Sequence, residues 1–542
     1  MAEIKSFLLL SSVILSMDLS FSARIAGFSG FYSGSHYFTI KKVMEELFSR
    51  GHEVRVFRTR CGPNYRKKIL ETCVYRLLKV VLVRPAVRDA PLSNEQKIPH
   101  RTFQTPYDEK DTENTAITAM EGKMWKTINR LHEMQRVNCE YMLNDTVLLQ
   151  ELKSFDLIVY ESFSFCAVLV SELLGIPKVI IFSGPPNGPG TFAHNIPHPV
   201  SYIPAPMTLF TSEMTFLQRL VNFGTYKLAQ SAEQVLIARY MGSLKEEYNI
   251  TPGKSYQEAA GTAELVLFLA DFALEYPQPL LPGQIMVGAI SAKGDPNTLP
   301  PELKDFINSS GGHGFIIASF GSYVKTIIAK EKIDVLAEGF GKVKQNVIWK
   351  LKGYIPPSLN KNIKVMSWIP QNDLLAHKDI KAFVSHVGHN SLYESAYHGV
   401  PVVAVPLYAD QFPNARKAEH FGIATVLDHK IMNAKQLSEA IQHVIDEPRF
   451  KRESKRISRL MKDNPRTPLE KAGDWIEYVH RHGGAQHLRA QVFNIPWYQY
   501  YLLDVIAFLV AIVALVVMVI RFTCRCFCKA CCKTSATKTK KE

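Results

Sequence analysis

The 542-residue chain lacks internal repeats, low-complexity stretches and any basic stripe interleaved with aromatic residues. The missing repeats exclude a solenoid, and the balanced composition is that of a globular protein. The missing basic stripe argues against nucleic-acid binding despite the net charge of +14, because the last 22 residues carry +6 of it and the remaining +8 is dispersed. One core cannot serve so long a chain, so we expect two domains.

Cysteine is scarce in the body of the chain and concentrated near its end. The body holds Cys61, Cys73, Cys139 and Cys166. Four cysteines allow three pairings, and their spacing does not choose among them. The other five lie in C-R-C-F-C-K-A-C-C (524–532), which contains one C-x-x-C but no second well-spaced ligand pair. Acylation of these cysteines at a membrane exit is therefore favoured over zinc binding.

Two apolar segments predict the compartment. Residues 1–23 have the pattern of a secretory signal peptide. Residues 502–520 are long enough to span a bilayer, with tyrosines and a tryptophan before them and Arg521 after them. The body would then be lumenal and the basic tail, 521–542, cytosolic.

Short motifs agree with this orientation. Glycosylation acceptor triplets begin at Asn144, Asn249 and Asn308. Lys538 and Lys540 resemble a retrieval signal for the endoplasmic reticulum, although a solvated charge run is an equal alternative. We expect a single-pass type I protein of the endoplasmic reticulum membrane.

The body has the pattern of an α/β fold. A short apolar strand at 23–28, a helical pattern closed by Gly51 and a strand at 52–57 predict a parallel βαβ unit. Similar strands recur along the chain, and a Pro-rich link, Y-P-Q-P-L-L-P-G, divides it at residue 283. We expect two doubly wound domains, 24–283 and 284–495, with ligands bound beyond the carboxyl ends of their strands. The stretch 58–150 has no clear pattern.

The stretch S-H-V-G-H-N-S-L-Y-E (385–394) combines a strand end, a glycine turn and a helix start. Backbone N–H groups at such a helix N-terminus favour a phosphate, with His386 as an added donor and Glu394 within reach of a ribose. A metal would need His386, His389 and Glu394 to converge from three elements, which is disfavoured. A structural turn with exposed histidines is the remaining alternative for this stretch taken by itself.

Neighbouring motifs favour the phosphate interpretation. W-x-P-Q (368–371), H-x-G-x-N-S-x-x-x-E and D-Q (410–411) together resemble the donor motif of UDP-dependent glycosyltransferases. The early G-S-H, the S-F-G-S, the Y-P-x-P link and W-I-E-Y-V-x-R-H-x-G-A-x-H-L-R (475–489) extend the likeness through nearly the whole chain. The sequence is therefore identified as a member of the animal UDP-glucuronosyltransferase superfamily. The resemblance implies the GT-B fold, with two Rossmann-like domains facing a cleft, plus one C-terminal transmembrane helix.

The resemblance also implies a role for each donor-site residue. Trp368 would stack on uracil with Gln371 bonded nearby, Glu394 would take the ribose hydroxyls, and Asp410 and Gln411 would hold sugar hydroxyls. The diphosphate would be held by Ser322, His386, Gly388 and Asn390. The sequence departs from the family at Val387, where most animal members have glycine. His389 receives no role.

On the acceptor side, the resemblance implies that His36 of G-S-H is the general base, oriented by an acidic residue. Its place at a helix start should keep the imidazole neutral. The family has aspartate at the end of the F-D-x-x-x-x-D strand, whereas this chain has Glu161, one methylene longer. The catalytic pair is thus His36 and Glu161, and we expect the pair to work.

The expected activity is transfer of a hexosyl or glucuronosyl group from a UDP-sugar to a small lipophilic acceptor, with inversion. No metal or other cofactor is expected. Leu269, where glucuronidating relatives commonly carry arginine, and Gln411 favour glucose, with glucuronic acid a close second. The apolar run 198–210 would line the acceptor site, enter the membrane or pack in the core. Homo-oligomerisation is left open. The alternative is a UDP-sugar-binding membrane protein without activity.

Overall fold

The computed structural model describes residues 22–29, 35–61, 98–107, 109–188, 190–321 and 329–536. The chain divides into two compact units, Met1–Leu488 and Arg489–Glu542. Ser322, nearly all of the predicted signal peptide and the lysines of the predicted retrieval signal lie outside the described residues.

The larger unit begins with a seven-stranded sheet in the order β3-β2-β1-β4-β5-β6-β7, with every neighbouring pair parallel. Its strands are β1 (Arg24–Phe28), β2 (Glu53–Cys61), β3 (His100–Thr105), β4 (Leu157–Glu161), β5 (Lys178–Phe182), β6 (Leu265–Phe268) and β7 (Gln284–Met286). The central strands are buried along their whole length, as parallel strands covered on both faces must be. β3 lies in the stretch where the sequence predicts no strand.

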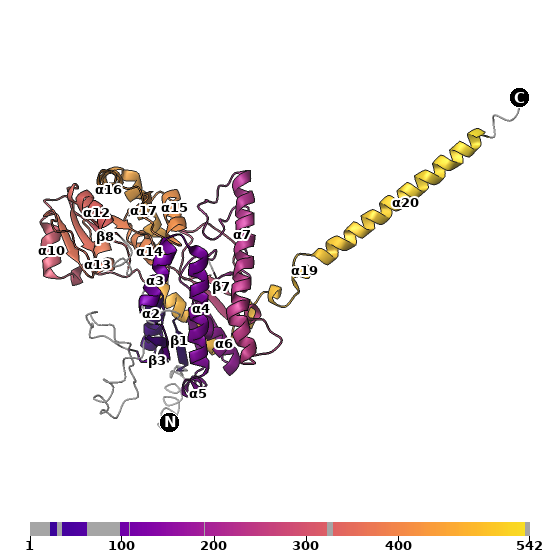
Figure 1. Cartoon of the computed structure of the whole chain (residues 1–542), viewed down its shortest axis with the longest axis horizontal. Helices are drawn as coiled ribbons and strands as arrows, with labels where there is room; N and C mark the ends of the chain where they lie inside the picture. The colour runs from indigo at the N-terminus through magenta and orange to yellow at the C-terminus, as the bar shows by residue number, and fades with distance from the viewer. Residues whose placement is uncertain are drawn as a thin grey trace, which may run out of the picture. The chain divides into compact units, whose positions relative to one another are not determined.

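Helices cover both faces of this sheet (Figure 1). They are α2 (Ser35–Ser49), α3 (Glu109–Met120), α4 (Met124–Leu143), α5 (Thr146–Leu152), α6 (Phe165–Leu174), α7 (Phe216–Ile237), α8 (Ser243–Glu247) and α9 (Tyr256–Gly261). Helix α2 packs in the core on one face, and α4, α5, α6 and α9 pack in the core on the other. A disulfide between Cys139 and Cys166 joins α4 to α6, which selects one of the three pairings that the sequence allows.

The second sheet has six parallel strands in the order β10-β9-β8-β11-β12-β13. They are β8 (Phe315–Ser319), β9 (Asn346–Lys350), β10 (Ile363–Met366), β11 (Ile380–Ser385), β12 (Val402–Ala404) and β13 (Ala424–Val426). Its helices are α10 (Pro301–Asn308), α12 (Lys330–Gly341), α13 (Gln371–Leu375), α14 (His389–His398), α15 (Gln411–His420), α16 (Ala434–Asp446) and α17 (Pro448–Lys462).

Both sheets have the strand order of a doubly wound fold. The order reverses between β1 and β4 in the first sheet and between β8 and β11 in the second. At such a reversal the loops leaving the two strands diverge to opposite faces and open a crevice at the carboxyl edge. The sequence therefore predicts the α/β architecture correctly, and each sheet offers one crevice.

The end of the larger unit returns to the first sheet. Helix α18 (Pro468–Arg481) begins at a capping box on Thr467 and packs against α2 in the core beneath that sheet. Arg50 of α2 pairs with Asp474 at 2.8 Å and with Glu477 at 3.1 Å. β7 and α18 thus follow residue 283 in sequence but pack with the strands that precede it.

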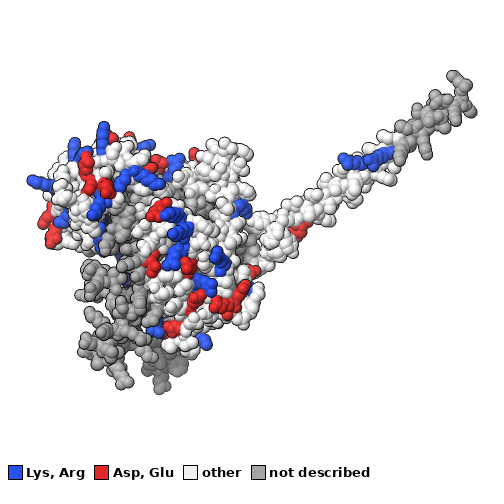
Figure 2. All heavy atoms as spheres, viewed as in Figure 1, with Lys and Arg blue, Asp and Glu red and all other residues white. Residues whose placement is uncertain are grey.

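The smaller unit contains α19 (Trp497–Tyr500) and the long helix α20 (Leu503–Ala536). Leu503–Cys528 is long and apolar enough to cross a membrane by length and composition. Figure 2 shows an uncharged stretch of α20 between an acidic residue near its start and basic residues further along. The predicted helix at 502–520 is thus present, and it continues well beyond the apolar stretch.

Candidate active site

His36 and Glu161 meet at the crevice of the first sheet. β1 leads to α2, whose second residue is His36, and the neighbouring strand β4 ends at Glu161. His36 Nδ1 lies 2.8 Å from Glu161 Oε1. The fully buried carboxylate also accepts from the Ser162 hydroxyl at 2.8 Å and from the Phe163 backbone N–H at 3.0 Å. The longer glutamate side chain therefore reaches the histidine.

Burial and nearby charges act in opposite directions on the pKa of His36. Burial lowers the pKa of His36, but the charge and hydrogen bond of Glu161 and the charge of Asp410 outweigh burial, so the pKa lies above its usual 6.5. The two nearby carboxylates stabilise the protonated ring, so they act against the neutral form that the helix N-terminus is expected to favour.

Asp410 brings the second domain to the same place. It precedes α15; part of the residue is exposed, but packing around its carboxylate raises its pKa, and the charge of His36 opposes that rise. Asn414 donates to Asp410 Oδ2 at 2.9 Å and fixes the carboxylate. His389, just after β11, contacts the carbonyl of Leu269, just after β6, so the carboxyl edges of the two sheets meet, in a region that we call the junction.

His386 lies at the crevice of the second sheet between two glycines. It follows β11, and a Cβ added to Gly321 or to Gly388 would approach its Nε2 to 2.9 or 2.7 Å. Gly321 also has φ +93°, which favours glycine, and at Gly388 a side chain would displace the ring, so the backbone passes close to the ring on two sides. Burial and the charge of Lys350 lower the pKa of His386 to about 4. We call His386 with Gly321 and Gly388 the cradle.

The turn beside the cradle is strained. Val387 has φ +53°, a left-handed conformation that a β-branched residue rarely adopts. Its N–H donates to the Ser385 hydroxyl at 3.0 Å, and its carbonyl accepts from Asn414 at 3.2 Å. The turn therefore holds Val387 in a conformation that glycine would adopt freely.

The residues predicted to hold the base and the ribose lie further along the same edge. Trp368 is 57% exposed, and Lys350 Nζ lies 4.7 Å from the centroid of its ring. Gln371 donates to Glu394 Oε2 at 2.7 Å, and burial raises the pKa of Glu394. Trp368 thus offers an aromatic surface, whereas Gln371 and Glu394 are bonded to each other.

The remaining predicted donor residues differ in accessibility. Asn390 is half-buried in the first turn of α14. Gln411 is buried, and its carbonyl oxygen accepts from the backbone N–H groups of Leu407 at 2.8 Å and Tyr408 at 3.2 Å. Its carbonyl is therefore engaged within its own loop.

His389, left without a role above, ties the two halves together. Its Nε2–H donates to the Leu269 carbonyl at 2.7 Å, and burial lowers its pKa to about 3. One turn along α14, Tyr393 donates to Glu275 at 2.6 Å, and Glu275 also pairs with Lys417. These buried contacts join segments more than 100 residues apart, so local sequence patterns carry no signal for them.

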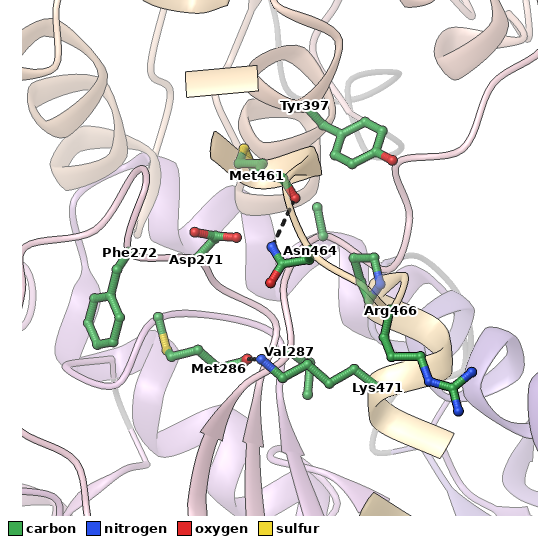
Figure 3. A pocket seen from close by; sticks show the side chains of 11 residues that line it. Asp271, Phe272, Met286, Val287, Tyr397, Met461, Asn464, Arg466 and Lys471 are labelled. Atoms are coloured by element: carbon green, nitrogen blue, oxygen red, sulfur yellow. Dashed lines mark hydrogen bonds between the residues drawn. The ribbon is translucent and has the colours of Figure 1, made fainter. Parts of the chain in front are cut away.

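A separate pocket lies between the two halves. Figure 3 shows its lining side chains, which come from residues 271–289 and from the segments around Tyr397 and 461–471. Lys471 donates to the Met286 carbonyl at 2.7 Å across it. The lining includes none of the predicted site residues. No cluster of metal-ligating side chains occurs in the described part of the chain.

Solved structures share this architecture. The glycosyltransferase VinC in complex with DTDP has a TM-score of 0.54 and 16% identity, covering 84% of this chain and 100% of that one. CalG4, the calicheamicin glycosyltransferase, has a TM-score of 0.52 and 16% identity, covering 85% and 99%. Two Rossmann-like domains joined at their carboxyl edges define the GT-B class of glycosyltransferases, and this protein has that fold.

Sequence relatives define the family. The family described as "UDP-glucoronosyl and UDP-glucosyl transferase" matches residues 31–540, and the chain belongs to it. UDP-glucuronosyltransferase 2A2 of Mus musculus is 32% identical over 89% of each chain. The 2-hydroxyacylsphingosine 1-beta-galactosyltransferase of Homo sapiens is 37% identical over 70% of this chain and 69% of its own. The protein is a UDP-sugar-dependent glycosyltransferase.

Proposed function

We propose that the protein transfers a hexosyl or glucuronosyl group from a UDP-sugar to a hydroxyl of a small lipophilic acceptor, with inversion and with His36 as the general base. The observation that carries this proposal is the 2.8 Å contact between His36 and Glu161 at the junction, opposite Asp410 of the donor domain.

The hydrogen bond to Glu161 determines which ring nitrogen acts. When Nδ1–H donates to the carboxylate, the lone pair of the neutral ring is on Nε2, which takes the proton of the acceptor hydroxyl. Glu161 then stabilises the imidazolium that forms. Glu161 is therefore a positioning residue, and His36 is the residue that contacts the acceptor.

The timing of proton transfer follows from pKa values. Full transfer from an alcohol to an ordinary imidazole would cost about 12 kcal/mol, whereas transfer from a phenol would cost about 5 kcal/mol. The raised pKa of His36 reduces its pKa difference from both the alcohol and the phenol. Deprotonation therefore accompanies attack on the anomeric carbon, and the attack occurs opposite the departing UDP, which inverts the configuration.

The cradle supports the leaving group. His386, with a pKa of about 4, is neutral at physiological pH and donates one N–H without adding a charge that titrates. Backbone N–H groups at the start of α14 add donors and the positive end of the helix dipole. Asn390 and Ser322 would complete the set, with Trp368 under the uracil, Glu394 at the ribose, and Asp410 and Gln411 at the sugar.

The donor sugar is a neutral hexose or glucuronic acid, and two observations favour different choices. Leu269 is apolar and 2% exposed, and its carbonyl is bonded to His389, so this position supplies no cation for a sugar carboxylate. Sequence relatives, however, are mostly UDP-glucuronosyltransferases, such as 2A2 of Mus musculus. A donor panel separates the two.

The apolar run 198–210 divides between two environments. Ile203 and Ala205 are buried, whereas Tyr202, Met207 and Leu209 are at least 40% exposed. The buried pair packs in the core, and the exposed residues are available to a lipophilic acceptor or a membrane. We propose that the body lies in the lumen of the endoplasmic reticulum, anchored by α20. The exposure of Asn144, Asn249 and Asn308 supports glycosylation there.

The test uses membranes that contain the full chain, a panel of UDP-sugars and a phenolic acceptor. We expect glycoside formation by the wild type, loss of it in His36→Ala, and no effect of a chelator. UDP release without a glycoside, or glycoside formation that His36→Ala leaves unchanged, would contradict the proposal and favour a UDP-sugar-binding protein. Glu161→Asp, which restores the usual family residue, should preserve or raise the activity.

A further inference from the structure

Helix α20 presents a stripe of cysteines beyond its apolar stretch. The helix continues from Arg521 through Ala536. At 3.6 residues per turn, four cysteine positions fall within about 100° of arc on one face. We call them the cysteine stripe: Cys524, Cys528, Cys531 and Cys532. Cys526 falls on the opposite side of the helix. Cys524, Cys526 and Cys528 are exposed free thiols.

A row of basic residues adjoins this stripe. Arg521, Arg525, Lys529 and Lys533 follow one another at intervals of four, on an arc of the helix that begins at the edge of the stripe and extends to one side of it. Figure 2 shows basic side chains on α20 directly after its uncharged stretch. Arginine and lysine at this level extend toward lipid phosphates. The row therefore places the start of the stripe in the headgroup layer.

The distances along the helix suit an attached acyl chain. At 1.5 Å per residue, Cys524 lies about 6 Å and Cys528 about 12 Å beyond Ile520, the last residue of the apolar stretch. The headgroup layer is about 5–8 Å thick. A long acyl chain attached to either thiol is long enough to turn back into the hydrocarbon.

We propose that the cysteine stripe is a site of S-acylation by long-chain acyl groups. The Sγ of a cysteine attacks the thioester carbonyl of an acyl-coenzyme A, a new thioester bond forms, and the bond to the coenzyme A sulfur breaks. The cysteine proton is released, and the departing coenzyme A thiolate takes up a proton. Each buried methylene contributes about 0.8 kcal/mol to membrane affinity. The inference rests on the proposed cytosolic orientation of the tail and is independent of the transfer reaction.

A zinc site explains the stripe less well. Four ligands of one zinc ion must all lie about 2.3 Å from it. Cys524 and Cys532, the ends of the stripe, are separated by about 12 Å along one helix, so a single chain cannot bring all four thiolates to one ion. Acylation requires only that each thiol be exposed near the membrane surface.

The test is an acyl-exchange assay on the full chain in eukaryotic cell membranes. Existing thiols are blocked with a maleimide, thioesters are cleaved with hydroxylamine, and the released thiols are labelled with a maleimide-linked polymer that shifts the gel mobility once per site. We expect a ladder of up to four steps for the wild type and none without hydroxylamine. Changing all four stripe cysteines to serine should abolish the ladder.

Cys526→Ser is the matched control, because it removes one thiol of the same tail on the opposite face. We expect it to leave the ladder unchanged. An unshifted wild type, or a ladder that only Cys526→Ser abolishes, would overturn the proposal. A membrane-impermeant maleimide on sealed microsomes tests separately on which side of the membrane the tail lies. Labelling of the unblocked tail cysteines only after the membrane is opened would overturn the orientation, and with it this inference, without bearing on sugar transfer.

Discussion

Two histidines, one at the strand reversal of each sheet, have pKa values shifted in opposite directions. His36 follows β1 and His386 follows β11, each beside the strand reversal of its own sheet. Two carboxylates raise the pKa of His36, whereas burial and Lys350 lower the pKa of His386 to about 4. Position in the fold places the imidazole, and the neighbouring charges determine its chemistry. A base needs a raised proton affinity, whereas a neutral donor needs a low one.

The largest effect should follow removal of the base. His36→Ala should lower kcat by about 10²- to 10⁴-fold, the usual contribution of a positioned acid or base. The KM for the UDP-sugar should change little, because the donor residues belong to the other domain. Initial rates at several donor concentrations measure both quantities. An equal loss in kcat and in donor affinity would contradict the assignment of His36 to catalysis alone.

Glu161→Gln should have the next largest effect. It keeps the size of the side chain but removes the charge that stabilises the imidazolium, so kcat should fall on the order of 10²-fold. Glu161 raises the pKa of His36, so its removal should lower that pKa. The base is active when neutral, and the acid limb of kcat against pH should therefore move to lower pH. Glu161→Asp provides the control, because it keeps the negative charge. An acid limb that does not move in Glu161→Gln would show that a group other than His36 produces it.

The cradle should affect donor binding instead. His386→Ala removes one hydrogen bond to a charged group, worth about 1.5–3 kcal/mol, so the KM for the UDP-sugar should rise roughly 10- to 100-fold. The acid limb should stay where it is, because His386 does not titrate near neutral pH. A shift of the acid limb in His386→Ala with an unchanged KM would contradict a role of this histidine in donor binding.

Gly388→Ala should give a smaller change of the same kind. The added Cβ would approach His386 Nε2 to 2.7 Å, so the ring must move away from its place in the cradle. We expect a weaker donor affinity with an unchanged acid limb. Gly224→Ala, on the exposed surface of α7 with nothing within 4 Å of an added Cβ, tests whether the effect is local.

Sequence patterns predict most of the fold because the buried parallel strands form continuous apolar runs. The strand predicted at 23–28 is β1 (Arg24–Phe28), and the strand predicted at 52–57 begins one residue later as β2 and extends to Cys61. β3 has no such run and is stabilised by pairing with β2, a contact that only the folded chain provides. The places of β7 and α18 likewise depend on tertiary packing.

The site was predictable in its composition but not in its electrostatics. The motifs indicate His36, Glu161 and His386, and the structure brings the first two together. The raised pKa of His36 depends partly on Asp410, which lies more than 370 residues away in sequence. The role of His389 depends on the carbonyl of Leu269 in the other half. Such effects require the tertiary structure, because residue spacing does not encode them.

The most direct test of the difference between the two histidines is to measure kcat and the UDP-sugar KM on one membrane preparation from about pH 5 to 9. The KM is measured with UDP-sugar rather than through the binding of UDP, because the terminal phosphate of UDP itself titrates near pH 6. The account predicts that kcat falls on the acid side with an apparent pKa above 6.5 while KM stays flat. A flat kcat, or a KM that rises together with the fall in kcat, would contradict it.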